Sequence, residues 1–231
     1  RKMYIVGLVV RITCVCAAIM FLVQQHVIPV IAIETEDNTC IPILQFLNRL
    51  LKLTVPVTYI WLLGFYLIFH LFLNLMAEIL RFGDRIFYKD WWNATTFDQY
   101  WRLWNLPVHY WLVRHLYFPC LRYGFSRANA ALAVFLFSAV MHELIVSVPF
   151  HMIRLYSFGA MLGQIPLVIL TKRLEKNPYW ASSYAGNALF WCTFCVVGQP
   201  MAVLLYYYDF TNDGLPVTML GRNATTVSMF G

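Results

Sequence analysis

Charged residues are scarce in this sequence. They make up 12% of its 231 residues, whereas hydrophobic residues make up 61%; soluble domains carry about 25% charged residues. This composition excludes an ordinary soluble domain and indicates an integral membrane protein. Several apolar runs exceed the roughly 18 residues that a membrane-spanning helix needs, and no long alternation of period two points to a membrane β-barrel. We therefore predict an all-α, polytopic bundle of transmembrane helices.

The motifs of several enzyme classes are also missing. The sequence has no nucleophile elbow, no P-loop, no zincin motif and no glycine pattern for binding a dinucleotide. Its six cysteines form no disulfide framework, and Cys192-x-x-Cys195 has no second pair or histidine cluster to complete a metal site. We therefore expect no metal. For an enzyme, we expect direct transfer between two bound substrates rather than a covalent intermediate on Ser or Cys.

The apolar runs divide the chain into five expected spans. The chain starts at Arg1, within an apolar run and without a signal peptide, so we expect it to begin partway through a longer protein. We treat it as one membrane-embedded domain, the C-terminal portion of that protein. The expected spans are residues 4–23, 55–80, 128–148, 155–170 and 184–208.

The second span carries polar residues on one face. His70, Asn74 and Glu78 stand at i, i+4 and i+8, which places them on the same side of a helix. They could line a cavity, or they could form an interhelical hydrogen-bond seam. We favour the seam.

The segment 81–127 connects the second and third spans. It opens with the polar, aromatic run Phe87-Tyr88-Lys89-Asp90-Trp91-Trp92-Asn93, called the FYKDWWN motif below. Aromatic residues then recur at three- and four-residue steps from Phe97, which predicts an amphipathic helix at the membrane interface. Pro107 disfavours helix at the residue before it and predicts a break near Trp104–Asn105.

The distribution of Lys and Arg predicts the orientation. Most of the basic loop residues fall on the side that holds segment 81–127, which makes that side cytosolic. The FYKDWWN motif should therefore face the cytosol and the C-terminal tail the lumen. Asn223-Ala224-Thr225 could then be glycosylated, whereas Asn93-Ala94-Thr95 should not be.

His142 and Glu143 are the most informative pair of ionisable residues. His142 lies about 21 Å along its predicted span, where lipid offers no polar partner. A neutral imidazole there could take a proton from a hydroxyl as a general base. The pair could instead form a structural seam between helices, and the residues alone leave both interpretations open. Neighbouring residues stand about 100° apart on a helix, so the two need not face one cavity; Ser138, one turn earlier, can share the face of His142.

The motif, taken with residues that follow it, resembles a known family. FYKDWWN matches the FYxDWWN signature of the sterol and diacylglycerol O-acyltransferase branch of the membrane-bound O-acyltransferases. Trp104-Asn105, Pro107-Val108-His109 and His142-Glu143 follow in that family's order. The later segments look most like the type 1 acyl-CoA:diacylglycerol acyltransferases; they are Ser147-Val148-Pro149, Gly163-Gln164-Ile165-Pro166 and Gly198-Gln199-Pro200. One departure is Leu144, where many relatives have an aromatic residue after His-Glu.

The resemblance implies roles for these residues. His142 would be the base that activates the hydroxyl of diacylglycerol, Asn105 would lie near the thioester of acyl-CoA, and Glu143 would orient or polarise His142. Gln164 and Gln199 would contact the acceptor. The acyl-CoA side would hold residues of the motif and of the helix after it, namely Phe87, Tyr88, Asp90, Trp91, Trp92, Asn93, Trp104 and His109.

The resemblance also implies the setting of the reaction. Acyl-CoA would be a substrate, so no cofactor is expected, and the other partners would be diacylglycerol and membrane lipid, with no nucleic acid. The protein would reside in the endoplasmic reticulum membrane and form a homo-oligomer. Two alternatives stay open: transfer to a sterol or a long-chain alcohol, and a non-catalytic lipid transporter or receptor.

Overall fold

The computed structural model describes residues 2–32, 43–181 and 184–212, and most of them are helical. Within these ranges no residue forms a β-strand. The predicted all-α class is therefore confirmed. Two further expectations, the position of the C-terminal tail and the state of Asn223, lie outside the described residues.

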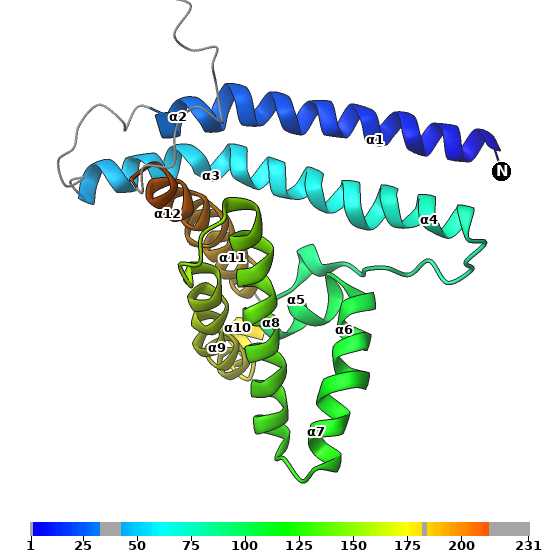
Figure 1. The fold of residues 1–231 in the computed structure, drawn as a ribbon. Helices are drawn as coiled ribbons and strands as arrows, with labels where there is room; N and C mark the ends of the chain where they lie inside the picture. The colour runs from blue at the N-terminus through cyan, green and yellow to red at the C-terminus, as the bar shows by residue number, and fades with distance from the viewer. Residues whose placement is uncertain (1, 33–42, 182–183, 213–231) are drawn as a thin grey trace, which may run out of the picture.

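Two long helical rods lie side by side (Figure 1). The first consists of α1 (Lys2–Leu22), a π-helical turn (Val23–Val27) and α2 (Ile28–Ala32). The second consists of α3 (Ile43–Phe65), a π-helical turn (Tyr66–Phe72) and α4 (Leu73–Ile79). The second rod begins before the predicted span 55–80, because Leu50, Leu53 and Val57 recur at helical spacing and are all buried.

The remaining helices form a second group beneath the rods in Figure 1. The helices α8 and α9 form an antiparallel hairpin, and α12 packs against α3. Short helices α5, α6 and α7 connect the rods to α8, and α7 lies beside α8. The bounds are α5 Phe97–Leu103, α6 Leu106–Leu112, α7 Phe118–Arg122, α8 Arg127–Phe150, α9 Tyr156–Leu174, α10 Pro178–Ala181, α11 Ala185–Cys192 and α12 Gln199–Asn212.

Four helical stretches of the described chain are long and apolar enough to cross a membrane: Lys2–Ile31, Ile43–Ile79, Arg127–Val148 and Ala185–Tyr206. The expected span 155–170 forms helix α9, but α9 is not among the four. It carries Gln164 in its middle and Lys172 and Arg173 in its last turn. The side of the membrane that each loop faces stays a prediction.

Two apolar clusters hold the helices together. The first joins α2, α3 and α12 through the buried residues Val27, Ile31, Leu50, Leu53, Val57 and Leu204. The second is largely aromatic and joins the FYKDWWN motif, α5 and α11 to the C-terminal end of α3. Its buried members are Trp91, Ala94, Phe97, Tyr100, Phe190 and Phe194. This second cluster fixes the position of the candidate site, because α5 carries part of that site.

Candidate functional site

The FYKDWWN motif braces the turn between α5 and α6. Its Lys89 N–H donates to the carbonyl of Leu103 at 2.9 Å, and its Phe87 carbonyl accepts from the N–H of Leu106 at 3.0 Å. These two backbone hydrogen bonds lie on either side of Trp104–Asn105, where the helix break was predicted. The break is present: Asn105 has a non-helical backbone, and its Oδ1 accepts from the N–H of Val108 at 3.1 Å as the N-cap of α6.

Trp91 of the motif anchors the brace in the aromatic cluster. Its side chain is 1% exposed, and its ring lies 5.0 Å from that of Phe65 and 5.2 Å from that of Trp61. Asn187 of α11 donates to the carbonyl oxygens of Trp92 and Ala94 at 2.8 and 2.9 Å. The motif is therefore held in place by ring contacts with α3 and by hydrogen bonds from α11.

Gly186 is required for the close contact between α11 and the residues that follow the motif. A Cβ at Gly186 would lie 2.6 Å from the carbonyl oxygen of Thr95, which is backbone and cannot swing away. The absence of a side chain lets the start of α11 approach the residues just after the motif. Nothing in the sequence pattern singled out this glycine.

The polar face of the second rod forms a hydrogen-bonded seam, but the predicted partner, another helix, is wrong. His70 Nδ1 lies 2.9 Å from the hydroxyl of Tyr88, and Glu78 forms an ion pair with Arg85 at 2.7 Å. Asn74 donates to the carbonyl of His70 one turn earlier at 2.7 Å. The seam joins the rod to segment 81–90 rather than to another helix. Burial raises the pKa of Tyr88 above its ordinary value, so its hydroxyl keeps its proton.

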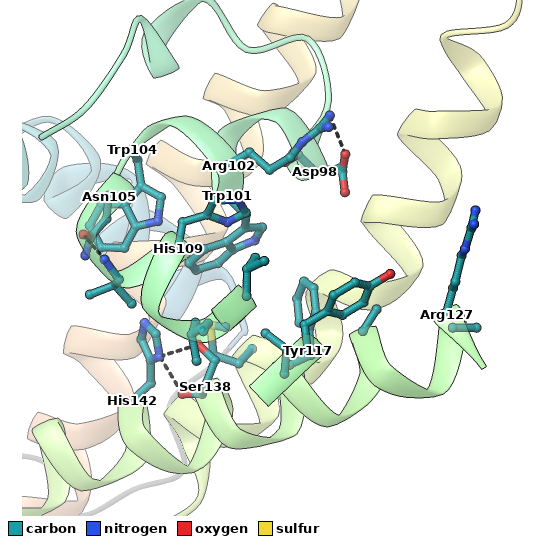
Figure 2. A pocket seen from close by; sticks show the side chains of 18 of the residues that line it. Asp98, Trp101, Arg102, Trp104, Asn105, His109, Tyr117, Arg127, Ser138 and His142 are labelled. Carbon is teal, nitrogen blue, oxygen red and sulfur yellow. Dashed lines mark hydrogen bonds and ion pairs between the residues drawn. The ribbon is translucent and has the colours of Figure 1, made fainter. Parts of the chain in front are cut away.

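A pocket of about 540 Å³ lies between α5–α6 and α8 (Figure 2). Its apolar lining consists of Trp101, Trp104, Val108, Leu112, Val113, Tyr117, Ala128, Ala131, Val134, Phe135 and Met161. Its polar lining consists of Asp98, Arg102, Asn105, His109, Arg127, Ser138, His142 and Lys172. A mostly apolar cavity with a few convergent polar groups is the usual form of a small-molecule site.

The pocket brings together four of the residues proposed from sequence: Trp104, Asn105, His109 and His142. Its wall does not include the proposed residues Phe87, Tyr88, Asp90, Trp91, Trp92, Asn93, Glu143, Gln164 and Gln199. Asp90 and Asn93 have exposed side chains, and Gln199 is half-buried at the start of α12. The motif thus acts on the pocket indirectly, through the Trp104–Asn105 turn that it braces and through Tyr100, whose ring contacts both Trp91 and the lining residue Trp101.

His142 is held in a defined orientation by its own helix. Its Nδ1 lies 2.7 Å from the carbonyl oxygen of Ser138 and 3.4 Å from the Ser138 hydroxyl. A carbonyl only accepts hydrogen bonds, so Nδ1 carries the proton in this contact. The neutral ring then has its lone pair on Nε2. Figure 2 shows the ring of His142 on the pocket side of α8, across from Trp101 and His109.

Gln164 acts on the pocket through Trp101. Its Oε1 accepts from the indole N–H of Trp101 at 2.9 Å. The Trp101 ring stands edge-on to the His142 ring, with 6.1 Å between the centroids and 90° between the planes. Gln164 therefore fixes an aromatic wall beside His142. Trp101 was missed as a site residue because its i, i+3 aromatic spacing is also that of an interfacial helix.

Glu143 is turned away from the pocket. Its side chain is buried, and its two oxygens accept five hydrogen bonds of 2.8–3.2 Å. The hydroxyl donors are Ser147 and Tyr206, and the backbone donors are the N–H groups of Arg154, Leu155 and Phe158. We call these contacts the Glu143 knot. It ties α8 to the start of α9 and to α12, and it includes no contact with His142.

The other end of the pocket is charged. The Asp98 carboxylate pairs with Arg102 at 2.7 Å and with Lys172 of α9 at 2.9 Å. In Figure 2 the Asp98–Arg102 pair lies on the opposite side of Trp101 from His142, and Arg127 stands at the start of α8. Burial, together with the nearby charge of Arg102, lowers the pKa of His109 below its ordinary value. This shift favours the neutral form of His109.

The comparisons with known proteins agree on one family. The profile of the membrane-bound O-acyltransferase family matches residues 2–207. The chain is 47% identical over 212 residues to diacylglycerol O-acyltransferase 1C of Glycine max, covering 92% of this chain and 40% of the relative. It is 47% identical over 192 residues to diacylglycerol O-acyltransferase 1 of Arabidopsis thaliana, covering 83% of this chain and 36% of the relative. It is 43% identical over 210 residues to diacylglycerol O-acyltransferase 1 of Dictyostelium discoideum, covering 91% and 33%. The chain thus spans at most about two fifths of the length of these relatives.

Proposed function

The chain belongs to the membrane-bound O-acyltransferase family, and we propose that the protein transfers a fatty acyl group from acyl-CoA to the free hydroxyl of diacylglycerol. Two findings support this proposal. Relatives named diacylglycerol O-acyltransferase 1 match the chain over most of its length. The pocket places a histidine with a free ring nitrogen among apolar walls that suit acyl chains.

The observation that carries the mechanism is the hydrogen bond from His142 Nδ1 to the carbonyl of Ser138. It leaves Nε2 as the basic nitrogen of the ring. In the proposed reaction, Nε2 takes the proton from the hydroxyl of diacylglycerol as the oxygen attacks the thioester carbon. A C–O bond forms and the C–S bond breaks. The proton then passes from His142 to the departing sulfur, which gives triacylglycerol and CoA.

Asn105 is proposed to contact the thioester. Its Oδ1 is used in capping α6, so the amide NH₂ is the group that can donate to the thioester carbonyl. A donor there would stabilise the oxygen as it gains negative charge. Trp104 and Trp101 flank this position and provide apolar walls. Gln164 supports Trp101, and we assign it a positioning role in place of the direct acceptor contact first expected.

The setting of the reaction is proposed with the chemistry. Diacylglycerol and acyl chains partition into the bilayer, whereas the CoA headgroup is anionic and soluble, so the pocket must meet both phases. The charged end of the pocket, with Arg102, Arg127 and Lys172, suits the headgroup. We propose that this end faces the cytosol, that the membrane is the endoplasmic reticulum, and that the protein works as a homo-oligomer.

The test is the acceptor range of the full-length protein. Microsomes from a host without its own triacylglycerol synthesis are supplied with labelled oleoyl-CoA and one of three acceptors: diacylglycerol, cholesterol or a long-chain alcohol. We expect triacylglycerol to be the main product. Efficient esterification of cholesterol or of the alcohol, with little triacylglycerol, would move the function to the alternative acyltransferase. No acyl transfer to any acceptor would favour a lipid transporter or receptor.

A further inference from the structure

Asp98 holds an unusual position at the charged end of the pocket. One of its carboxylate oxygens pairs with Arg102 on its own helix and the other with Lys172 on α9. All three side chains line the pocket. The cations are more exposed than the carboxylate: the side chains of Arg102 and Lys172 are 59% and 51% exposed, and that of Asp98 is 25% exposed. Asp98 therefore neutralises two cations that face the cavity.

The ion pairs of Asp98 are not needed to hold α5 against α9, because other contacts already join these helices. The buried Thr171 hydroxyl accepts from the N–H of Phe97 at 3.4 Å, one residue before Asp98, and Phe97 itself packs in the aromatic cluster. Leu167 and Val168 of α9 pack against the same cluster. Ion pairs with exposed partners add little to stability. A carboxylate that lines a pocket and occupies two cations has a larger effect on the binding of an anion than on the fold.

We propose that Asp98 is a built-in counter-ion that competes with the phosphate groups of the acyl donor for Arg102 and Lys172. The proposal rests on acyl-CoA being the donor. When the headgroup binds, its phosphates replace the carboxylate as partners of the two cations. When CoA leaves, the carboxylate returns. Asp98 thereby weakens headgroup binding and favours release of the spent CoA.

The position of Asp98 predicts which kinetic constant it changes. Asp98 lies on the far side of Trp101 from His142 (Figure 2) and makes no described contact with the candidate reacting groups. Its charge should therefore act on the KM for the donor and on the release of CoA. Because the partners are partly exposed, the effect should shrink as ionic strength rises.

The experiment compares Asp98→Asn with wild-type protein in the full-length chain. The probe is CoA without an acyl group, and its Kd is measured at low and high salt; the KM and kcat for oleoyl-CoA are measured in parallel. We expect the Kd for CoA and the KM for oleoyl-CoA to fall by about three- to tenfold at low salt. The difference in Kd should narrow in high salt.

A matched control removes the same charge near the site but outside the pocket. Glu175→Gln changes the exposed residue that follows α9, three residues after Lys172, and should leave both constants near the wild-type values. Asp98→Ser serves as the second variant in case Asp98→Asn fails to fold. In the double variant Asp98→Asn/Lys172→Gln, most of the increase in CoA affinity that is expected for Asp98→Asn alone should be absent.

The outcomes separate this proposal from the proposed function. Tighter CoA binding in Asp98→Asn and not in Glu175→Gln supports the counter-ion. Equal or weaker CoA binding in Asp98→Asn would overturn it and make Asp98 a residue that positions its two cations. If wild-type protein binds CoA but forms no triacylglycerol, the proposed acceptor is wrong while the CoA comparison still decides the role of Asp98.

Discussion

His142 and Glu143 are neighbours on α8, and they lie in opposite kinds of surroundings. His142 is half-buried at the wall of a pocket, and its ring is oriented by one residue of its own helix, Ser138, through the carbonyl and the hydroxyl. Glu143 is almost fully buried, and five donors from α8, the connection before α9, α9 and α12 surround it. The turn of about 100° between adjacent helical residues directs one side chain to the pocket and the other to the helix interface.

The difference shows two uses of a polar group in an apolar helix. A carboxylate with all its acceptor positions filled stabilises one arrangement of α8, α9 and α12, and it has no capacity left for chemistry. An imidazole with one nitrogen filled and one free is oriented and still able to accept a proton. His142 and Glu143 are therefore adjacent in the His-Glu pair and still have different structural roles.

The largest effect is expected at His142. Replacing His142 with Ala removes the proposed base, and general-base catalysis contributes about 10²- to 10⁴-fold in rate. Triacylglycerol synthesis from oleoyl-CoA should fall by that factor, while the melting temperature of the purified protein stays close to that of wild type. Synthesis within about threefold of wild type by folded His142→Ala protein would remove His142 from the chemistry.

Glu143 should show the reverse pattern. Glu143→Ala leaves buried donors of the Glu143 knot without a partner, at a cost on the order of 3 kcal/mol in the free energy of unfolding. Glu143→Gln keeps the shape and part of the hydrogen bonding, and should lower the melting temperature less while retaining measurable synthesis per folded molecule. Tyr206→Phe removes one donor of the Glu143 knot, together with the acceptor of the Ser157 N–H, and serves as the matched control.

For the Glu143 variants, a melting temperature near wild type together with triacylglycerol synthesis as low as in His142→Ala would contradict a purely structural role of Glu143. Such a result for Glu143→Gln would mean that the carboxylate takes part in the reaction, as the resemblance first implied.

A smaller effect is expected from the Gln164–Trp101 pair. Gln164→Ala should lower kcat by about tenfold, because the loss of one hydrogen bond of about 1.4 kcal/mol releases the Trp101 wall beside His142. Trp101→Phe removes the same hydrogen bond and keeps an aromatic ring. If Gln164 acts only through Trp101, the double variant should be no slower than the slower single variant. Additive losses would indicate a separate contact of Gln164 with substrate.

The smallest effect concerns His109. Its pKa is lowered by burial and by the nearby Arg102, so the unfolded chain binds a proton at higher pH than the folded chain does. Folding stability should then fall as the pH drops through the ordinary histidine range toward the lowered value. In His109→Gln this part of the pH dependence should disappear. If the melting temperatures of wild type and His109→Gln change in parallel between pH 7.5 and 5.5, His109 does not contribute to the pH dependence of stability.

Much of the architecture could be predicted from the sequence. Long apolar runs predicted the helices, and Pro107 predicted the break at Trp104–Asn105. The spacing of His70, Asn74 and Glu78 predicted a polar seam, although with another helix instead of with segment 81–90. The family resemblance carried by the FYKDWWN motif is confirmed by the family match. These features depend on local periodicity and local backbone chemistry, which a sequence contains directly.

The rest depends on contacts between distant residues. Tyr206 meets Glu143 from 63 positions away, and Gln164 meets Trp101 from 63 positions away. Gly186 is needed only because Thr95 packs against it. The FYKDWWN motif braces the turn that carries Asn105 through backbone contacts with Leu103 and Leu106, and its place on the acyl-CoA side stays a prediction. None of these pairings leaves a periodic signal in the sequence.

The central claim is that His142 keeps its proton on Nδ1 and presents a bare Nε2 to the pocket. Nitrogen-15 NMR of histidine-labelled protein at pH 7.5 tests this directly, with the His142 signals identified by their loss in His142→Gln. We predict a neutral ring in the Nδ1–H tautomer. A neutral ring with the proton on Nε2 would contradict the account because its free nitrogen, Nδ1, faces the Ser138 carbonyl instead of the pocket. An imidazolium would contradict it because neither ring nitrogen could accept the proton of the acceptor hydroxyl.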